Sequence, residues 1–411
     1  MKAIPHLLIL AWAAASASDL QPTGVIEPAL FFRAGFDTNP AASGGTSATI
    51  LGERDTLTSA AGISLSYSWT ATTAAKPALK LSYTGEAVRF DRWSGEDYST
   101  HSLGLRGELT AGGWKFTGDA SSLFVAGSAD TLPSVATVNA NAIALWRERR
   151  QQWQHRAKVQ AQGLYGNWLV RGTGTLLDYD YQTNVAAGRF AFADRSDLQG
   201  ALDLGWKQSA DSLWFTGVRS GHQVQAIVPL PNCGFDYTNN YYRLAAGWEG
   251  KPFADTTVTF AAGPDFRHYT GTVDPRVFLG GRDRTSLWFE AGFASKLTQN
   301  LTLTGKAARM DWLSSLGKSA YLDTCVETAM SLMLTPTWSA RLTAKVHRCD
   351  FFPSYRDDWE SFLGAGATWK LSNNTALILD LLRHHGWNTL STLPEREFQR
   401  LVVNLGATFK L

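Results

Sequence analysis

Few side chains in this sequence stand at spacings that enzymes or metal sites use. His384 and His385 are adjacent, and neighbours on an extended strand point to opposite faces, so the pair cannot chelate one ion. Asp357 and Asp358 are too few acidic residues for a calcium loop. The chain contains no Gly-x-Ser-x-Gly element, phosphate loop or His-Glu-x-x-His stretch. We therefore predict a protein that is not an enzyme and that uses no metal and no cofactor.

Three cysteines, Cys233, Cys325 and Cys349, give at most one internal disulfide. Their spacing matches no zinc or redox motif. Cys325 and Cys349 fall on the same face of consecutive predicted strands, one step diagonal from register if Leu334 pairs with Trp338. Two alternatives stay open: a disulfide after a small shift, or two separate thiols. The diagonal distance favours the thiols.

The elements that must position these side chains are strands. Ile63, Leu65, Tyr67 and Trp69 alternate with serines, and the same period of two recurs along the chain, most clearly near 103–110, 153–165, 198–207, 242–248, 287–293, 301–307 and 340–346. A soluble β-sandwich also alternates, so the period alone does not identify the solvent.

Three further features favour lipid as the solvent of the apolar face. The alternating segments run for roughly 11 to 15 residues, against about 5–6 in an ordinary strand. Short connections alternate with long ones, as in outer-membrane barrels. Tryptophans gather at the ends of the apolar faces, where a membrane interface would lie: Trp69, Trp114, Trp146, Trp153, Trp206, Trp248, Trp312, Trp338 and Trp369.

The composition agrees with this interpretation. Charged residues make up 18% of the chain, below the roughly 25% of soluble domains, and aromatic residues make up 12%. The formal net charge of +2 gives no bulk attraction for nucleic acid, which we exclude as a partner. No apolar run after the first residues has the length of a membrane helix.

Counting from the connections, we predict an all-β fold: a closed antiparallel transmembrane β-barrel of about eighteen strands, with sixteen as the next choice, short periplasmic turns and longer outer loops. Both chain ends then lie on the periplasmic side. Segment 166–194 is interpreted as one long outer loop that could constrict or plug the lumen, with 173–181 as an alternative strand. The predicted strands are 28–37, 58–70, 77–90, 99–110, 113–125, 138–148, 152–165, 195–207, 211–224, 238–249, 255–269, 284–297, 300–312, 319–334, 337–350, 357–371, 374–387 and 397–411.

The first residues are typical of an export signal. Lys2 is followed by the short apolar stretch 7–13 and by Ala15-Ser16-Ala17, a small-residue cleavage site. We predict a signal peptide over 1–17 and a single barrel domain over 18–411. The alternative, a retained anchor, would need about 20 apolar residues.

The two ends of the mature chain carry resemblances to known barrels. The last strand presents one apolar face that ends in Phe409 and Leu411, and it resembles the C-terminal assembly signal of outer-membrane barrels, which usually closes with Phe or Trp. A buried last strand of a soluble sheet is the alternative. Phe36, Asp37 and Asn39 resemble the aromatic-Asp-x-Asn opening of the β-barrel porin-2 family. That resemblance implies a porin-type barrel of about 16–18 strands.

In such a barrel the polar faces line a water-filled passage. Twelve candidate cations against eight anions suggest a mild preference for anions; the alternative is that opposite charges on neighbouring strands pair and stiffen the wall. Arg156, Lys158, Gln160 and Gln162 form the densest polar ladder, which we predict to line a constriction. The predicted pore-lining residues are Arg106, Lys115, Arg156, Lys158, Gln160, Gln162, Lys207, Arg243, Lys306, Arg341 and Lys345.

The predicted function is an outer-membrane, porin-like channel for passive or weakly selective passage of small hydrophilic solutes. An export barrel for a polymer such as a polysaccharide is an alternative, and so is a plugged structural or adhesive barrel. Expected partners are outer-membrane lipid, the barrel-assembly machinery during biogenesis and, as an option, two further copies in a homotrimer.

Overall fold

The computed structural model describes residues 23–40, 55–70, 78–127, 149–182, 192–226, 236–273, 282–314, 320–352, 356–389 and 397–411. Eighteen strands lie in these ranges, with one short 3-10 helix, Ser94–Glu96, between β3 and β4. No helix in the described ranges is long and apolar enough to cross a membrane. The strands are β1 (Thr23–Asp37), β2 (Thr56–Thr70), β3 (Ala78–Phe90), β4 (Tyr98–Ala111), β5 (Trp114–Ala126), β6 (Gln152–Tyr165), β7 (Trp168–Tyr181), β8 (Arg195–Ser209), β9 (Ser212–Gln225), β10 (Asn239–Phe253), β11 (Thr256–Tyr269), β12 (Asp283–Lys296), β13 (Leu301–Leu313), β14 (Ala320–Met333), β15 (Trp338–Phe352), β16 (Arg356–Lys370), β17 (Thr375–Asn388) and β18 (Phe398–Lys410).

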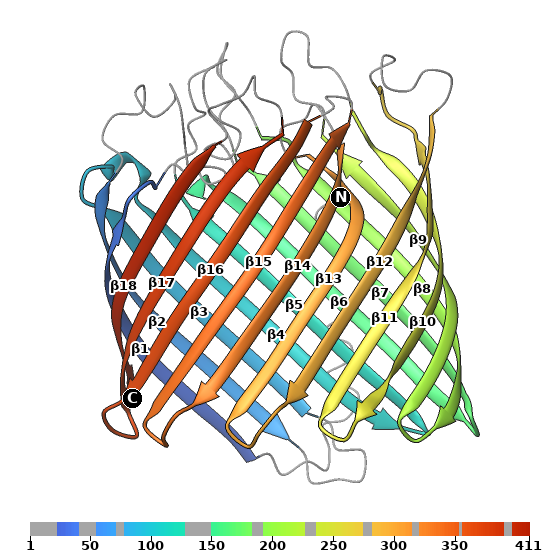
Figure 1. Cartoon of the computed structure of the whole chain (residues 1–411), viewed down its shortest axis with the longest axis horizontal. Coiled ribbons are helices and arrows are strands. Elements are labelled where there is room, and N and C mark those ends of the chain that lie inside the picture. The colour runs from blue at the N-terminus through green and yellow to red at the C-terminus, as the bar shows by residue number, and fades with distance from the viewer. Residues whose placement is uncertain are drawn as a thin grey trace.

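The strands form one closed antiparallel ring (Figure 1). Each strand pairs with the next along the chain, and β1 also pairs with β18, with Ala29 opposite Lys410 and Asp37 opposite Val402. Closure leaves no free sheet edge, so every strand has a hydrogen-bonding partner on both sides. This is the condition for a sheet to cross a lipid bilayer.

Tight hairpins gather at one rim of the ring, the lower rim in Figure 1. Gly112 and Gly113 join β4 to β5 with φ of +57° and +81°, and Gly166 begins the β6–β7 turn with φ of +59°. Two-residue hairpin turns of the favoured hand need positive φ, which glycine adopts without a steric penalty. The predicted short turns at 111–113, 208–211, 298–300, 335–337 and 372–374 all join consecutive strands at this rim.

The outer face of the ring is a continuous apolar surface. Leu202, Val218 and Leu244 lie directly opposite one another on β8, β9 and β10, and their exposed fractions are 56%, 52% and 52%. The row continues through Pro264 on β11 to Leu287 on β12. Soluble monomers rarely expose such a patch, and lipid is the solvent that accommodates it.

Paired tryptophans mark both ends of the apolar face. Trp168 and Trp206 lie 4.9 Å apart between ring centroids and Trp338 and Trp369 lie 5.2 Å apart, both pairs near the hairpin rim. Trp359 and Trp387, nearer the other rim, stack at 5.8 Å. Indole rings prefer the bilayer interface because they are apolar but carry one N–H donor. The spacing of these pairs along the strands gives the barrel two aromatic girdles.

The predicted total of eighteen strands is confirmed, and the alternative of sixteen is wrong, but the map contains an error. β5 pairs directly with β6, with Asp119 opposite Lys158, so no strand lies between them in the ring. The predicted strand 138–148 falls outside the described residues. The predicted turn 148–152 therefore belongs to the long connection between β5 and β6, and β6 runs opposite to the direction we expected.

The missed strand is β7, in the segment interpreted as an outer loop or plug. Residues 168–181 pair with β6 on one side and with β8 on the other, so they are a strand of the barrel wall. The alternative strand at 173–181 was the better interpretation. The outward face of β7 carries Gly172 and Gly174 between Val170 and Leu176. Glycine has no side chain to signal the apolar alternation, so the period of two is lost there.

The closing strands are joined by a buried ion pair at the rim opposite the hairpins. The Arg400 guanidinium on β18 donates to both oxygens of Asp37 at the end of β1, with Nη2–Oδ2 at 2.6 Å and Nε–Oδ1 at 3.0 Å. The Asp37 side chain is 2% exposed and also accepts the backbone N–H of Asn39 at 3.0 Å. The Asp-x-Asn element thus links the first strand to the last.

We expect the substitution Asp37→Ala to lower the free energy of unfolding by roughly 3–5 kcal/mol, because it leaves the Arg400 charge partly buried without its partner. Urea unfolding in lipid vesicles, followed by tryptophan fluorescence, measures the change. Asp37→Asn keeps the acceptor oxygen for Asn39 and should cost less. Equal midpoints for Asp37→Ala and the parent protein would contradict a role in ring closure.

Candidate functional site in the barrel lumen

Contacts across the ring identify the inner face of each strand. Arg195 on β8 donates to the carbonyl oxygen of Leu313 on β13 at 2.6 Å. β8 and β13 are five places apart in the ring, so the Arg195 side chain can reach the Leu313 carbonyl only through the interior. Directly opposed residues of paired strands point to the same face of the sheet. The inner face of β8 and the pairing of each strand with its neighbours therefore identify the inner face of every strand.

By this assignment, all eleven predicted pore-lining residues lie on the inner face. They do not form one cluster but are spread around the ring, and their part in conduction stays a prediction. Arg106, Arg156, Lys158, Lys306 and Arg341 are exposed; Lys115, Gln160, Gln162, Lys207 and Lys345 are half-buried; Arg243 is buried.

The interior has two unlike sides. On β3 to β6, here called the open wall, inward side chains such as Lys80, Arg106 and Lys158 are exposed. On β7 to β11, here called the charged wall, the inward side chains pack into a buried network. The ladder that we predicted to line a constriction, residues 156 to 162 of β6, belongs to the open wall. There Arg156 donates to the Tyr179 hydroxyl at 3.0 Å and Gln160 donates to Gln162 at 3.0 Å.

The charged wall is built from arginines that share aspartates. Asp203 accepts from Arg171 Nε at 2.9 Å and from Arg219 Nη1 at 2.8 Å. Asp265 accepts from Arg243 Nε at 2.8 Å and from Arg267 Nη2 at 2.9 Å. Asp203 and Asp265 are 3% and 0% exposed, so each carboxylate is held by two guanidinium groups away from solvent. Buried charges persist only when they are paired and hydrogen-bonded in this way.

Aromatic rings separate neighbouring guanidinium groups in the charged wall. The Tyr241 ring has the Arg243 Cζ atom 4.4 Å from its centroid and the Arg267 Cζ atom at 4.7 Å. Trp288, which is 2% exposed, receives Arg219 at 5.3 Å. Ring faces attract cations and replace part of their lost hydration.

A regular spacing in the sequence marks the charged wall, although our sequence interpretation missed it. Arginines recur every 24 positions on the inner faces of β7 to β11: Arg171, Arg195, Arg219, Arg243 and Arg267. The interval equals one strand plus one connection. A search for long-period repeats of one charged residue type would have found the series.

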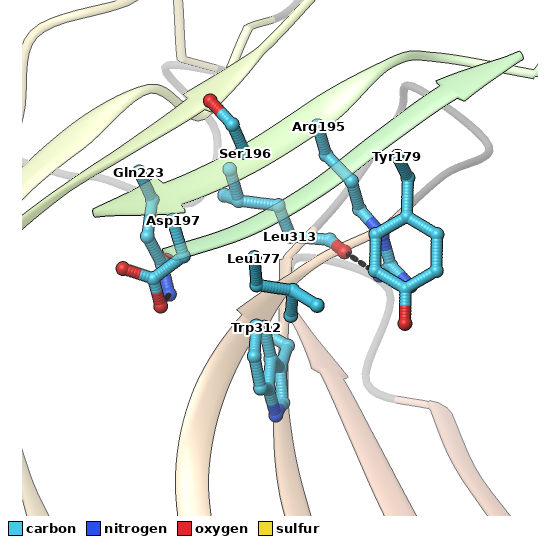
Figure 2. Close-up of a pocket in the computed structure, with 8 residues that line it drawn as sticks. All are labelled: Leu177, Tyr179, Arg195, Ser196, Asp197, Gln223, Trp312 and Leu313. Atoms are coloured by element: carbon cyan, nitrogen blue, oxygen red, sulfur yellow. Dashed lines mark hydrogen bonds between the residues drawn. The ribbon is translucent and has the colours of Figure 1, made fainter. Parts of the chain in front are cut away.

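The upper end of β13 bends into the lumen and rests on the charged wall. The β12–β13 ladder has only eight residue pairs, ending at Phe289 opposite Arg309. Beyond that point, backbone carbonyl oxygens of β13 and the following residue accept hydrogen bonds from the side chains of other strands: Leu313 from Arg195, as Figure 2 shows, Ser314 from Gln225 at 2.5 Å, and Asp311 from Gln223 at 3.3 Å.

Ion pairs fix the same bend. The Asp311 carboxylate, 1% exposed, lies 3.3 Å from Arg267 Nε and accepts the Ser286 hydroxyl at 2.9 Å. Arg284 lies 3.7 Å from the other Asp311 oxygen, and its Cζ atom lies 3.5 Å from the centroid of the Phe352 ring. Within the described residues, segment 311–314 therefore narrows the lumen. Of the segment 166–194, which we predicted could constrict or plug it, residues 168–181 form β7 and residues 183–191 lie outside the described residues.

The two described cysteines lie as the predicted register placed them. β14 and β15 pair with Leu332 opposite Ala340, the register that follows from pairing Leu334 with Trp338. Cys325 is opposite His347, and Cys349 is opposite Asp323, so the two sulfur atoms occupy a diagonal and are not bonded to each other. The inner faces of these strands bring the cysteines next to a histidine and an aspartate.

A closed ring of eighteen antiparallel strands with an apolar exterior, two aromatic girdles and a polar interior is a transmembrane β-barrel of the bacterial outer-membrane type. The sequence matches no protein-family model, so the β-barrel porin-2 resemblance has no support, and it matches no curated protein.

Solved structures of similar topology include OccAB3 of Acinetobacter baumannii, with a TM-score of 0.42 and 10% identity over 94% of this chain and 99% of that one. OccK2 (OpdF) of Pseudomonas aeruginosa in complex with glucuronate aligns with a TM-score of 0.44 and 10% identity, over 94% and 98% of the two chains. Pseudomonas aeruginosa OpdK with vanillate gives the same values.

We expect the double substitution R195M/Q225L to raise single-channel conductance, because it removes the donors that hold the Leu313 and Ser314 carbonyls across the lumen. The control is Lys158→Met, which also removes one inward cation but lies on the open wall. Planar-bilayer recordings compare the two. An increase no larger than that of Lys158→Met would show that the bend of β13 does not limit the current.

Proposed function

We propose that this barrel is an outer-membrane channel for passive or weakly selective passage of small hydrophilic solutes. One observation supports the proposal most directly. Charged side chains on the inner face of the open wall, among them Lys80, Arg106, Asp119 and Lys158, are exposed within a ring whose outer face is apolar. Exposed charges inside a barrel need water around them, and eighteen strands enclose enough space for an aqueous lumen.

A mild preference for anions is part of the proposal. Lys80, Arg106, Asp119 and Lys158 lie directly opposite one another on β3, β4, β5 and β6, and we call them the open-wall row. Three cations against one anion give the row a net positive charge. The charged wall contributes less to selectivity because four of the five arginines in its series, Arg171, Arg219, Arg243 and Arg267, are already paired with Asp203, Asp265 and Asp311. Rings of one sign of charge select ions of the other sign.

Other roles remain as competing hypotheses. An export barrel for a polymer and a plugged structural or adhesive barrel share the same wall. Among the described residues, the bend of β13 narrows the lumen but leaves the inward charges of the open wall exposed, which favours the channel. The proposed partners are outer-membrane lipid, the barrel-assembly machinery, which would read the strand ending in Phe409 and Leu411, and small hydrophilic solutes; a homotrimer is an option.

Planar-bilayer recordings test the channel directly. We expect steady ohmic steps from the purified, detergent-solubilised barrel, and a reversal potential in a potassium chloride gradient with the sign of weak chloride preference. Silent bilayers containing a correctly folded barrel, recognised by its heat-dependent gel migration, would favour the plugged or export roles. Ohmic steps with cation selectivity would keep the channel and remove the anion preference.

The open-wall row makes a sharper prediction. R106E/K158E changes the charge of the row by four units, and we expect it to move the reversal potential to the cation-selective side. R106K/K158R keeps the charge and should leave the reversal potential unchanged. If both variants behave like the parent protein, selectivity is set elsewhere in the lumen.

A further inference from the structure

Four side chains with metal-binding atoms lie together on the inner face of β14 and β15. Asp323 and Cys325 stand two positions apart on β14, and His347 and Cys349 stand two positions apart on β15. The register places Asp323 opposite Cys349 and Cys325 opposite His347. Directly opposed residues of an antiparallel pair have Cβ atoms about 4.5–5.5 Å apart. We call these four residues the donor square.

The donor atoms of three of these residues are close enough to share one ion. His347 Nε2 lies 2.6 Å from Asp323 Oδ1, and Cys349 Sγ lies 3.6 Å from His347 Nε2. One ligand atom from each of Asp323, His347 and Cys349 lies within 4.8 Å of the other two. In a tetrahedral zinc site, bonds of about 2.3 Å to sulfur and about 2.0–2.1 Å to nitrogen put these two atoms about 3.5 Å apart.

We propose that the donor square binds one divalent metal ion of the zinc class, with His347, Cys349 and Asp323 as ligands and Cys325 as the fourth. Thiolate and imidazole are ligands for Zn²⁺ and its chemical relatives, whereas Mg²⁺ and Ca²⁺ prefer sites made entirely of oxygen. Two thiolates, one imidazole and one carboxylate complete a tetrahedral set. The ion replaces the hydrogen bond between His347 and Asp323, and the thiols lose their protons on binding.

Neighbouring strands supply partners for the ligands. Glu360 on β16 lies opposite His347, and Asp358 lies opposite Cys349. Glu360 Oε2 lies 3.2 Å from His384 Nε2. Ligating histidines commonly donate their second ring N–H to a carboxylate, which orients the ring. Glu360 lies directly opposite His347, where a carboxylate could accept that N–H.

The exposure of the ligands and the separation of the two cysteines both agree with a metal site. The side chains of His347 and Asp323 are 21% and 20% exposed, so an ion in the lumen can reach them. The two cysteines occupy one diagonal of the square, and residues on a diagonal are typically about 7–8 Å apart. A disulfide needs Cβ atoms about 3.5–4.5 Å apart, so the register holds the sulfur atoms too far apart to oxidise to each other without backbone movement.

Cobalt(II) added to the purified barrel in detergent, with a phosphine reductant present, tests the site. Co²⁺ replaces Zn²⁺ in tetrahedral sites and reports thiolate ligands through a charge-transfer absorption band. We expect one Co²⁺ per barrel, a thiolate band, and loss of that band when Zn²⁺ is added. C325S/C349S should abolish the band, and His347→Ala should weaken Co²⁺ binding at least tenfold.

The matched control is Cys233→Ser, which removes the remaining thiol of the sequence and should leave the band unchanged. Heat-dependent gel migration confirms that each variant is folded, and unfolded variants are replaced by the conservative Asp323→Asn. Absence of the band in the parent protein, or its persistence in C325S/C349S, would overturn the proposal. So would finding Cys325 and Cys349 joined by a disulfide in protein isolated from membranes.

Discussion

The structure depends on one constraint: a backbone that crosses hydrocarbon must satisfy its N–H and C=O groups within the protein. A sheet meets this requirement only when its first and last strands pair, as β1 and β18 do here. Closure has a second effect, since it gives every strand one face toward lipid and one toward the interior. The period-two sequence follows from that division, and so does the ion pair between Asp37 and Arg400 at the closing seam.

Charged side chains cannot face acyl chains, so they collect in the interior, where they have two ways to remain stable. On the charged wall they pair with each other: Asp203 and Asp265 each hold two guanidinium groups, with Tyr241 and Trp288 packed between them. On the open wall they remain exposed. The barrel thus contains one stretch of wall with paired, buried charges and another with exposed charges.

The β12–β13 seam shows how a strand of the wall can itself form a constriction. Pairing stops after eight residues, and the freed end of β13 turns inward to dock on β8, β9 and β11. The carbonyl groups that lose ladder partners are satisfied by Arg195, Gln223 and Gln225. The donor square lies on β14 and β15, next to this bend, on an inner face that the same register makes continuous.

The sequence by itself determined the features that depend on one strand or one hairpin: the barrel class, the short-turn rim, the inner face for the eleven predicted pore-lining residues, and the β14–β15 register. These follow from the period of two and from turn residues, which act locally. The total of eighteen strands was also correct, although the predicted map counted 138–148 and left out β7. The sequence failed where the local signal was weak, as at β7, whose outward face carries Gly172 and Gly174. Only the tertiary structure decided which aspartate each arginine pairs with, where β13 leaves the wall, and that Asp323 and His347 meet two cysteines. Those contacts join residues 118 positions apart in the case of Arg195 and Leu313, and 363 positions apart in the case of Asp37 and Arg400. They depend on ring closure and strand twist, which no single segment encodes.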